Sequence, residues 1–123
     1  MNKRIGSLIV ALCLLCSMLP MSASATSIIA SGICGRNLTW QLDEDGLLTI
    51  SGTGAMTDFD IYDYEKDAAP WIDYLNQIEA VVIDNGVTSI GEDAFWYCEN
   101  LKTIELSDTV ISLGDFSIYC CDM

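Results

Sequence analysis

Apolar and polar positions recur in the same order in two consecutive segments of equal length, 78–100 and 101–123. The two segments align without a gap, and their apolar positions coincide. Four aligned pairs are identical, namely Val87/Val110, Ser89/Ser112, Gly91/Gly114 and Cys98/Cys121. A unit this small cannot bury its apolar edge alone, so the pattern predicts repeated units that stack on one another.

Each repeat is expected to open with a strand, at 80–83 and 103–106. Successive side chains of a strand point to opposite faces. The residues expected to face the core are Val81, Ile83, Ile104 and Leu106. The residues expected to face outward, which are the candidate ligand-binding residues, are Ala80, Val82, Thr103 and Glu105.

The rest of each repeat is predicted from turn residues and apolar pairs. A turn at 84–86 leads to the apolar pair Val87 and Ile90, and a short helical turn follows around 93–97. The second repeat has its counterpart strand around 110–113. The fold class predicted from this pattern is a β-rich α/β repeat.

Residues 26–77 form a different block, which we expect to cap the repeats. Two runs rich in β-branched and aromatic residues, 38–42 and 47–51, flank a turn that ends in Gly46, which predicts a β-hairpin. Residues 26–32 are expected to be a loose leader. An acidic loop at 58–67 precedes a short helix that begins at Pro70 and presents Trp71, Tyr74, Leu75 and Ile78 at helical spacing.

The segment 1–25 resembles a secretory signal peptide. Lys3 and Arg4 precede an apolar run, and the run ends before the small residues 23–25. We expect cleavage after Ala25, so no membrane span is expected in the mature chain. The predicted localisation is secreted or cell-surface, that is, extracellular. The predicted domains are therefore the signal peptide 1–25, the cap 26–77 and the repeats 78–123.

Charge narrows the range of partners. The chain has a formal net charge of −13, and loss of Lys3 and Arg4 leaves three basic against 18 acidic residues, or −15 (3 − 18). Repulsion from phosphate excludes nucleic acid as a partner, and the same charge disfavours anionic lipid. Basic partners and cations are favoured.

Four cysteines follow the signal segment: Cys34, Cys98, Cys120 and Cys121. Cys98 and Cys121 hold the same place in successive repeats, so we expect them to stack as buried thiols, with a disulfide as the alternative. The spacing of the cysteines resembles no zinc site, and the chain has no histidine. No metal and no cofactor are predicted.

Other candidate chemistry is weaker. The acidic loop offers five carboxylates to calcium, but Tyr62 stands where an EF-hand ligand is needed, which favours a solvated loop. Trp96 and Tyr119 share a repeat position, which favours core packing over a sugar platform, and Trp40 and Trp71 are expected to pack in the cap. No catalytic residue is predicted, although paired carboxylates leave a glycoside hydrolase as a less favoured alternative.

The motifs resemble a known family. The stretch from Val87 to Cys98, followed by 101–108, resembles the BspA-like leucine-rich repeat (LRR_5 type) family of bacterial surface proteins. The upstream segments 34–40, 46–54 and 69–71 resemble the N-terminal part that often precedes such repeats. The resemblance implies a leucine-rich-repeat solenoid, here about two units (78–100 and 101–123) with an N-terminal β-hairpin cap, in an exported protein with roles in adhesion and recognition.

Together these observations predict a non-catalytic module that binds a protein or glycan ligand on a host or neighbouring cell. Two units are short for a solenoid, so we expect either a truncated array or self-association through an open C-terminal edge. In the competing interpretation the chain is a purely structural N-terminal fragment of a larger surface protein.

Overall fold

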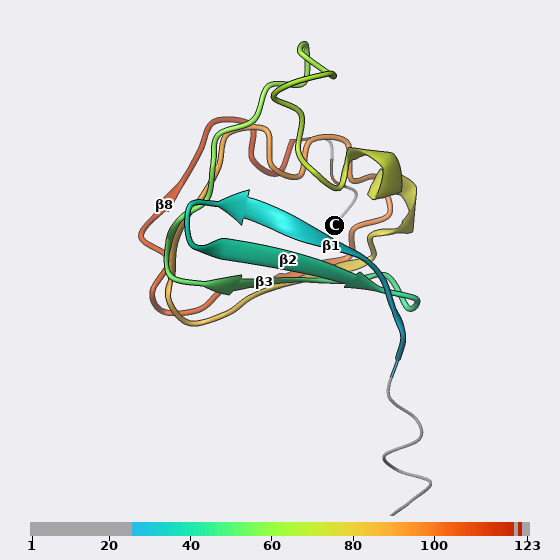
Figure 1. The fold of residues 1–123 in the computed structure, drawn as a ribbon, viewed down its shortest axis with the longest axis horizontal. Coiled ribbons are helices and arrows are strands. Elements are labelled where there is room, and N and C mark those ends of the chain that lie inside the picture. The colour runs from blue at the N-terminus through green and yellow to red at the C-terminus, as the bar shows by residue number, and fades with distance from the viewer. Residues whose placement is uncertain (1–25, 120, 122–123) are drawn as a thin grey trace, which may run out of the picture.

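The structure is a computed structural model, and it describes residues 26–119 and 121 (Figure 1). The predicted signal peptide, Cys120 and residues 122–123 lie outside the described residues. The elements are β1 (Ile28–Gly35), β2 (Leu38–Asp43), β3 (Leu47–Gly52), β4 (Gly54–Ala55), the 3₁₀ helix η1 (Ile72–Gln77), β5 (Ala80–Ile83), β6 (Val87–Ile90), β7 (Thr103–Glu105) and β8 (Ser112–Leu113). The strands form one sheet in the order β1-β2-β3-β5-β7 and a second in the order β4-β6-β8.

The predicted hairpin is confirmed as β2 and β3, which pair antiparallel. Leu38, Trp40 and Leu42 alternate with exposed residues, as a half-buried strand requires. One carboxylate shapes the turn, because Oδ1 of Asp43 accepts hydrogen bonds from the backbone N–H groups of Asp45 (2.9 Å) and Leu47 (3.0 Å). Gly46 completes the turn with a φ of 84°.

The loose leader expected at 26–32 is wrong. Residues 28–35 form β1, which pairs antiparallel with β2 at the edge of the larger sheet. The segment contains two glycines and an irregular register, and these weaken the alternation by which a strand is identified. Gly32 lies against the indole of Trp40, where a larger residue would collide with the ring nitrogen.

The N-terminal block does more than cap the repeats, because it supplies the first coil of the stack. β3 pairs parallel with β5, and β5 pairs parallel with β7. β4, β6 and β8 pair parallel in the same succession on the second sheet. Three coils therefore stack, where the repeat pattern predicted two units and a separate cap.

The first coil is longer than the second. Leu47 pairs with Ala80 and Ala80 with Thr103, so the first coil runs from position 47 to position 80 and the second from 80 to 103. The additional chain lies between Phe59 and Trp71, since Trp71 already contacts Ala94 across one repeat period. It forms the acidic loop, whose base is closed by a hydrogen bond from Asp60 N to Asp67 O (2.7 Å). The loop projects from the stack, in green, in Figure 1.

Inward side chains from successive coils meet in rows. Leu48, Val81 and Ile104 are register partners, and Ile50 pairs with Ile83. The predicted inward orientation is confirmed for Val81 and Ile83, which are buried. Burial is incomplete in the last coil, where Ile104 is half-buried and Leu106 is 46% exposed. No further strand pairs with β7 in the described chain to cover them.

Trp71 is fully buried in the core, in agreement with the prediction that it packs within the N-terminal block. It stacks on Phe95 (ring centroids 5.5 Å apart, interplanar angle 18°) and meets Trp40 and Phe59 edge-on at 5.8 and 5.7 Å. Its indole Nε1 donates a buried hydrogen bond to the carbonyl oxygen of Ala94 (2.7 Å). Trp71 of the first coil therefore contacts the second coil through both ring stacking and a hydrogen bond, in addition to the pairing of the strands.

The helical turn expected at 93–97 is absent. The segment is a series of tight turns, with left-handed backbone at Asp93 (φ 54°) and Tyr97 (φ 57°). Left-handed residues interrupt helical hydrogen bonding, which explains the difference. The helix after Pro70 is present, as the 3₁₀ helix η1.

Candidate binding surface

The outward face of the five-stranded sheet is the candidate binding surface. Register partners form one row across all five strands, consisting of Ser31, Gln41, Thr49, Val82 and Glu105. Adjacent strands lie about 4.8 Å apart, so four intervals give a row about 19 Å wide. We name these five residues the outer row.

The structure brings the four predicted ligand-binding residues together. Ala80 is the register partner of Thr103, and Val82 is the register partner of Glu105. Thr103 and Glu105 are exposed, whereas Ala80 and Val82 are half-buried between neighbouring strands. Their role in binding stays a prediction.

Sequence reasoning missed the part of this surface that lies on the N-terminal strands. Ser31, Gln41 and Thr49 continue the row, and Leu47 extends the neighbouring pair formed by Ala80 and Thr103. The sequence predicted the hairpin from its composition and its turn, without assigning an outward face to it. The sequence did not show that the hairpin joins the repeats, because the acidic loop lengthens the first coil and conceals the period.

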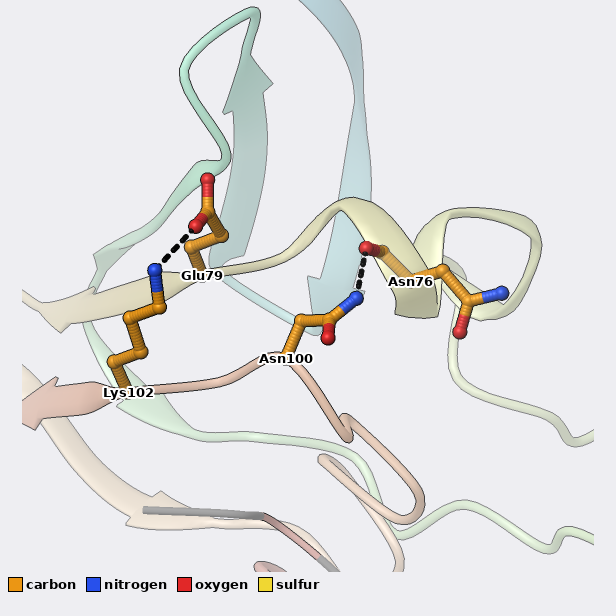
Figure 2. A network of polar contacts seen from close by, with 4 residues as sticks. All are labelled: Asn76, Glu79, Asn100 and Lys102. Carbon is orange, nitrogen blue, oxygen red and sulfur yellow. Dashed lines mark hydrogen bonds and ion pairs between the residues drawn. The ribbon is translucent and has the colours of Figure 1, made fainter.

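Polar contacts tie the coils together at one end of the sheet (Figure 2). Asn100 Nδ2 donates to the carbonyl oxygen of Asn76 (2.7 Å), and Lys102 Nζ forms an ion pair with Glu79 Oε1 (2.8 Å). The hydrogen bond from Lys102 to Glu79, followed by the negative charge of Glu79, raises the pKa of Lys102. These residues line an open depression of about 310 Å³ beside the hairpin turn.

The expectation that Trp96 and Tyr119 are core residues is wrong. The two rings do stack one coil apart, with centroids 4.5 Å apart and an interplanar angle of 22°. Trp96 is only half-buried, however, and Tyr119 is 48% exposed. The pair therefore lies on the side of the stack, outside the main core.

Cys34 and Cys98 are buried free thiols. The Sγ atom of Cys121 contacts the carbonyl oxygen of Phe95 (3.1 Å), and its charge influences Cys98. The two cysteines therefore stack as the repeat predicted, with no disulfide at Cys98. Burial raises the pKa of both Cys34 and Cys98 to about 12, with a smaller contribution from Cys121 at Cys98.

Two carboxylates of the acidic loop accept hydrogen bonds from backbone N–H groups. Asp58 Oδ1 accepts a hydrogen bond from Glu92 N (2.9 Å), and Asp60 Oδ1 accepts one from Tyr62 N (2.8 Å). Across residues 26–119 and 121, no three Asp, Glu, Cys or His side chains converge as metal ligands. None of the helices in this part of the chain is long and apolar enough to cross a membrane.

Comparisons with known proteins support the repeat interpretation. Residues 73–123 match the family described as BspA type Leucine rich repeat region (6 copies). The structure is similar to that of a leucine-rich repeat protein from Eubacterium ventriosum ATCC 27560, with a TM-score of 0.66 and 35% sequence identity. The match covers 75% of this chain and 24% of that chain, so the present chain spans about a quarter of that protein. No curated protein matches the chain.

The parallel register of the coils, the repeat match and the structural similarity agree with one another. The fold is a β-rich leucine-rich-repeat fold. Residues 73–123 are therefore a BspA-type leucine-rich repeat region, in a chain whose fold is similar to that of a bacterial leucine-rich repeat protein.

Proposed function

We propose that this chain is a secreted or cell-surface module that binds or adheres to a protein or glycan without catalysing a reaction. The observation that carries the proposal is the outer row, which is continuous over five strands. The match of residues 73–123 to a BspA type Leucine rich repeat region supports the proposal, because the resemblance to that family implies a bacterial surface protein with roles in adhesion and recognition. The class of ligand, protein or glycan, is likewise proposed.

The chemistry of the outer row suits a polar ligand. Serine, glutamine and threonine side chains donate and accept hydrogen bonds, and Glu105 adds a carboxylate acceptor. Val82 supplies an apolar contact at the fourth strand. A rigid sheet holds these groups at fixed spacing, so little side-chain freedom is lost on binding.

An array of immobilised glycans and extracellular matrix proteins tests the proposal. Val82→Arg places a long charged side chain on the outer row, and Asn85→Arg makes the same change in charge at an exposed turn. We expect the native protein to retain at least one ligand at moderate salt, the Val82 variant to lose it, and the Asn85 variant to keep it. Retention of every ligand by the Val82 variant would overturn the assignment of the surface.

Self-association is the second candidate role, and the edge of the last coil supports it. Several apolar side chains there are exposed: Leu106, Ile111, Leu113, Phe116, Ile118 and Tyr119. Covering such an edge with a second copy would remove the unpaired side of β7 and β8. Sedimentation velocity at increasing protein concentration tests self-association, which we expect Leu113→Glu to weaken. A monomer at all concentrations would reject this role.

A further inference from the structure

The side of the stack that faces the acidic loop holds a second cavity, separate from the outer row. Its volume is about 380 Å³, and all three coils contribute to its wall. The loop supplies Phe59, Asp60, Ile61 and Tyr62, the second coil supplies Glu92, Asp93 and Trp96, and the third supplies Phe116. We name it the aromatic cavity.

One wall of this cavity is an ordered group of rings. Phe116 meets Trp96 edge-on (centroids 5.6 Å apart, interplanar angle 76°) and meets Tyr119 in the same way at 5.5 Å. Phe116 is 56% exposed, and Tyr62, on the acidic loop, is 89% exposed. Rings held in place yet open to solvent offer their faces to a ligand.

The charge of the cavity is uniformly negative. Asp60, Glu92 and Asp93 line it, whereas none of the cationic side chains in the described chain does. Partial desolvation, and then the charges of Asp93, Asp115, Asp58 and Asp60, raise the pKa of Glu92. The carboxylates therefore repel one another, and a cation in the cavity would relieve that repulsion.

We propose that the aromatic cavity binds an arginine side chain of a protein partner. A guanidinium group is planar and weakly hydrated, so it stacks on aromatic faces while its N–H groups bond to carboxylates. Trp96, Phe116 and Tyr62 supply the faces, and Glu92 and Asp60 supply the acceptors. A lysine ammonium gains less here, because it is a compact, strongly hydrated charge without a face to stack.

The ligand probe is the peptide acetyl-Gly-Arg-Gly-Arg-Gly-amide, and its control carries citrulline, an uncharged isostere, in place of arginine. Titration calorimetry measures affinity. Tryptophan fluorescence gives a second signal, because Trp40 and Trp71 are buried and Trp96 is the indole near the ligand. We expect saturable binding of the arginine peptide, at least about tenfold weaker binding of the citrulline peptide, and a change in fluorescence.

Matched variants locate the site. Phe116→Gly and Tyr62→Ala each remove one ring, and each should weaken binding about threefold to tenfold. Tyr62 lies on the projecting loop, so its variant keeps the fold intact. Glu92→Gln should weaken binding by a similar factor, whereas Glu99→Gln, which removes the same charge outside the cavity, should change it less than about twofold.

Three results would overturn the proposal. They are equal binding of the arginine and citrulline peptides, unchanged binding by both the Tyr62 and Phe116 variants, and tighter binding of free spermidine than of the arginine peptide. The Val82→Arg variant should bind the peptide normally. Failure at the aromatic cavity is thereby distinguished from failure at the outer row.

Discussion

Asp93 and Phe116 hold the same place in successive coils and share a left-handed backbone, with φ values of 54° and 53°. The repeat therefore extends from side-chain pattern to backbone torsions. Aspartate tolerates this region of φ and ψ, whereas a bulky aromatic residue adopts it only at a cost of about 1–2 kcal/mol. Phe116 is held there by the turn, and its ring lies in the aromatic cavity.

A pair of substitutions at Phe116 isolates that strain. Phe116→Gly and Phe116→Ala both remove the ring, and they differ only in the Cβ atom. Alanine is normally the more stable residue, by about 0.5–1 kcal/mol within regular structure. At this left-handed position we expect the opposite order, with the glycine variant about 1 kcal/mol more stable in urea unfolding. A more stable alanine variant would show that the backbone here is not left-handed.

The two buried tryptophans of the first coil should respond differently to loss of the indole N–H. Trp71→Phe leaves the buried carbonyl of Ala94 without its donor, and we expect a loss of about 1–3 kcal/mol beyond the change in volume. Trp40 Nε1 is buried without a hydrogen-bond partner, so Trp40→Phe removes an unsatisfied group. We expect that variant to be the less damaging of the two in denaturant unfolding. Equal losses would contradict the hydrogen-bond assignment.

Gly91 lies where the first two coils approach each other closely. A Cβ atom there would overlap the carbonyl oxygen of Thr57, whereas one at Gly54 would meet no atom within 4 Å. Gly91→Ala should therefore cost about 3 kcal/mol or more, because the coils must separate. Gly54→Ala should cost only about 1 kcal/mol, from its positive φ of 99°. Thermal unfolding of the two variants gives the comparison, and a tolerated Gly91→Ala would argue against this stacking.

Alkaline pH should destabilise the fold through its buried thiols. Burial, with a smaller contribution from Cys121, raises the pKa of Cys98 from 9.0 to about 12. Between these pH values the folded state binds more protons than the unfolded state. The contribution of the Cys98 thiol to the free energy of unfolding is therefore fully present below about pH 9 and is lost as the pH rises toward 12. Cys98→Ala should reduce this fall by up to about 1.4 kcal/mol per pH unit. An unchanged slope in pH-dependent unfolding would contradict the burial of this thiol.

The sequence predicted best where the period is intact. Register pairs confirm that Val81 and Ile104, and Ile90 and Leu113, lie in adjacent layers. Apolar side chains that recur at one constant spacing have one arrangement that buries them together, so the pattern determines the pairing. The hairpin was equally predictable, because runs rich in β-branched and aromatic residues and an Asp-rich turn ending in glycine are local signals.

The sequence predicted least where the chain departs from its period. The acidic loop separates β3 from β5, so the parallel pairing of Leu48 with Val81 has no signal of constant spacing. The glycines of β1 weaken the alternation of side chains by which a strand is identified in a sequence. The aromatic cavity was missed because a repeated aromatic position is compatible with both core and surface, and only the arrangement of the loop and the turns decides between them.

The central claim is that the N-terminal strands and the repeats share one sheet, and that the outer row is therefore continuous. Nuclear Overhauser effects between backbone protons of an isotopically labelled sample test it most directly. We predict cross-strand contacts from Thr49 to Val82 and from Val82 to Glu105. Contacts from Val82 to Glu105 without any from Thr49 to Val82 would separate the hairpin from the repeats and contradict the account.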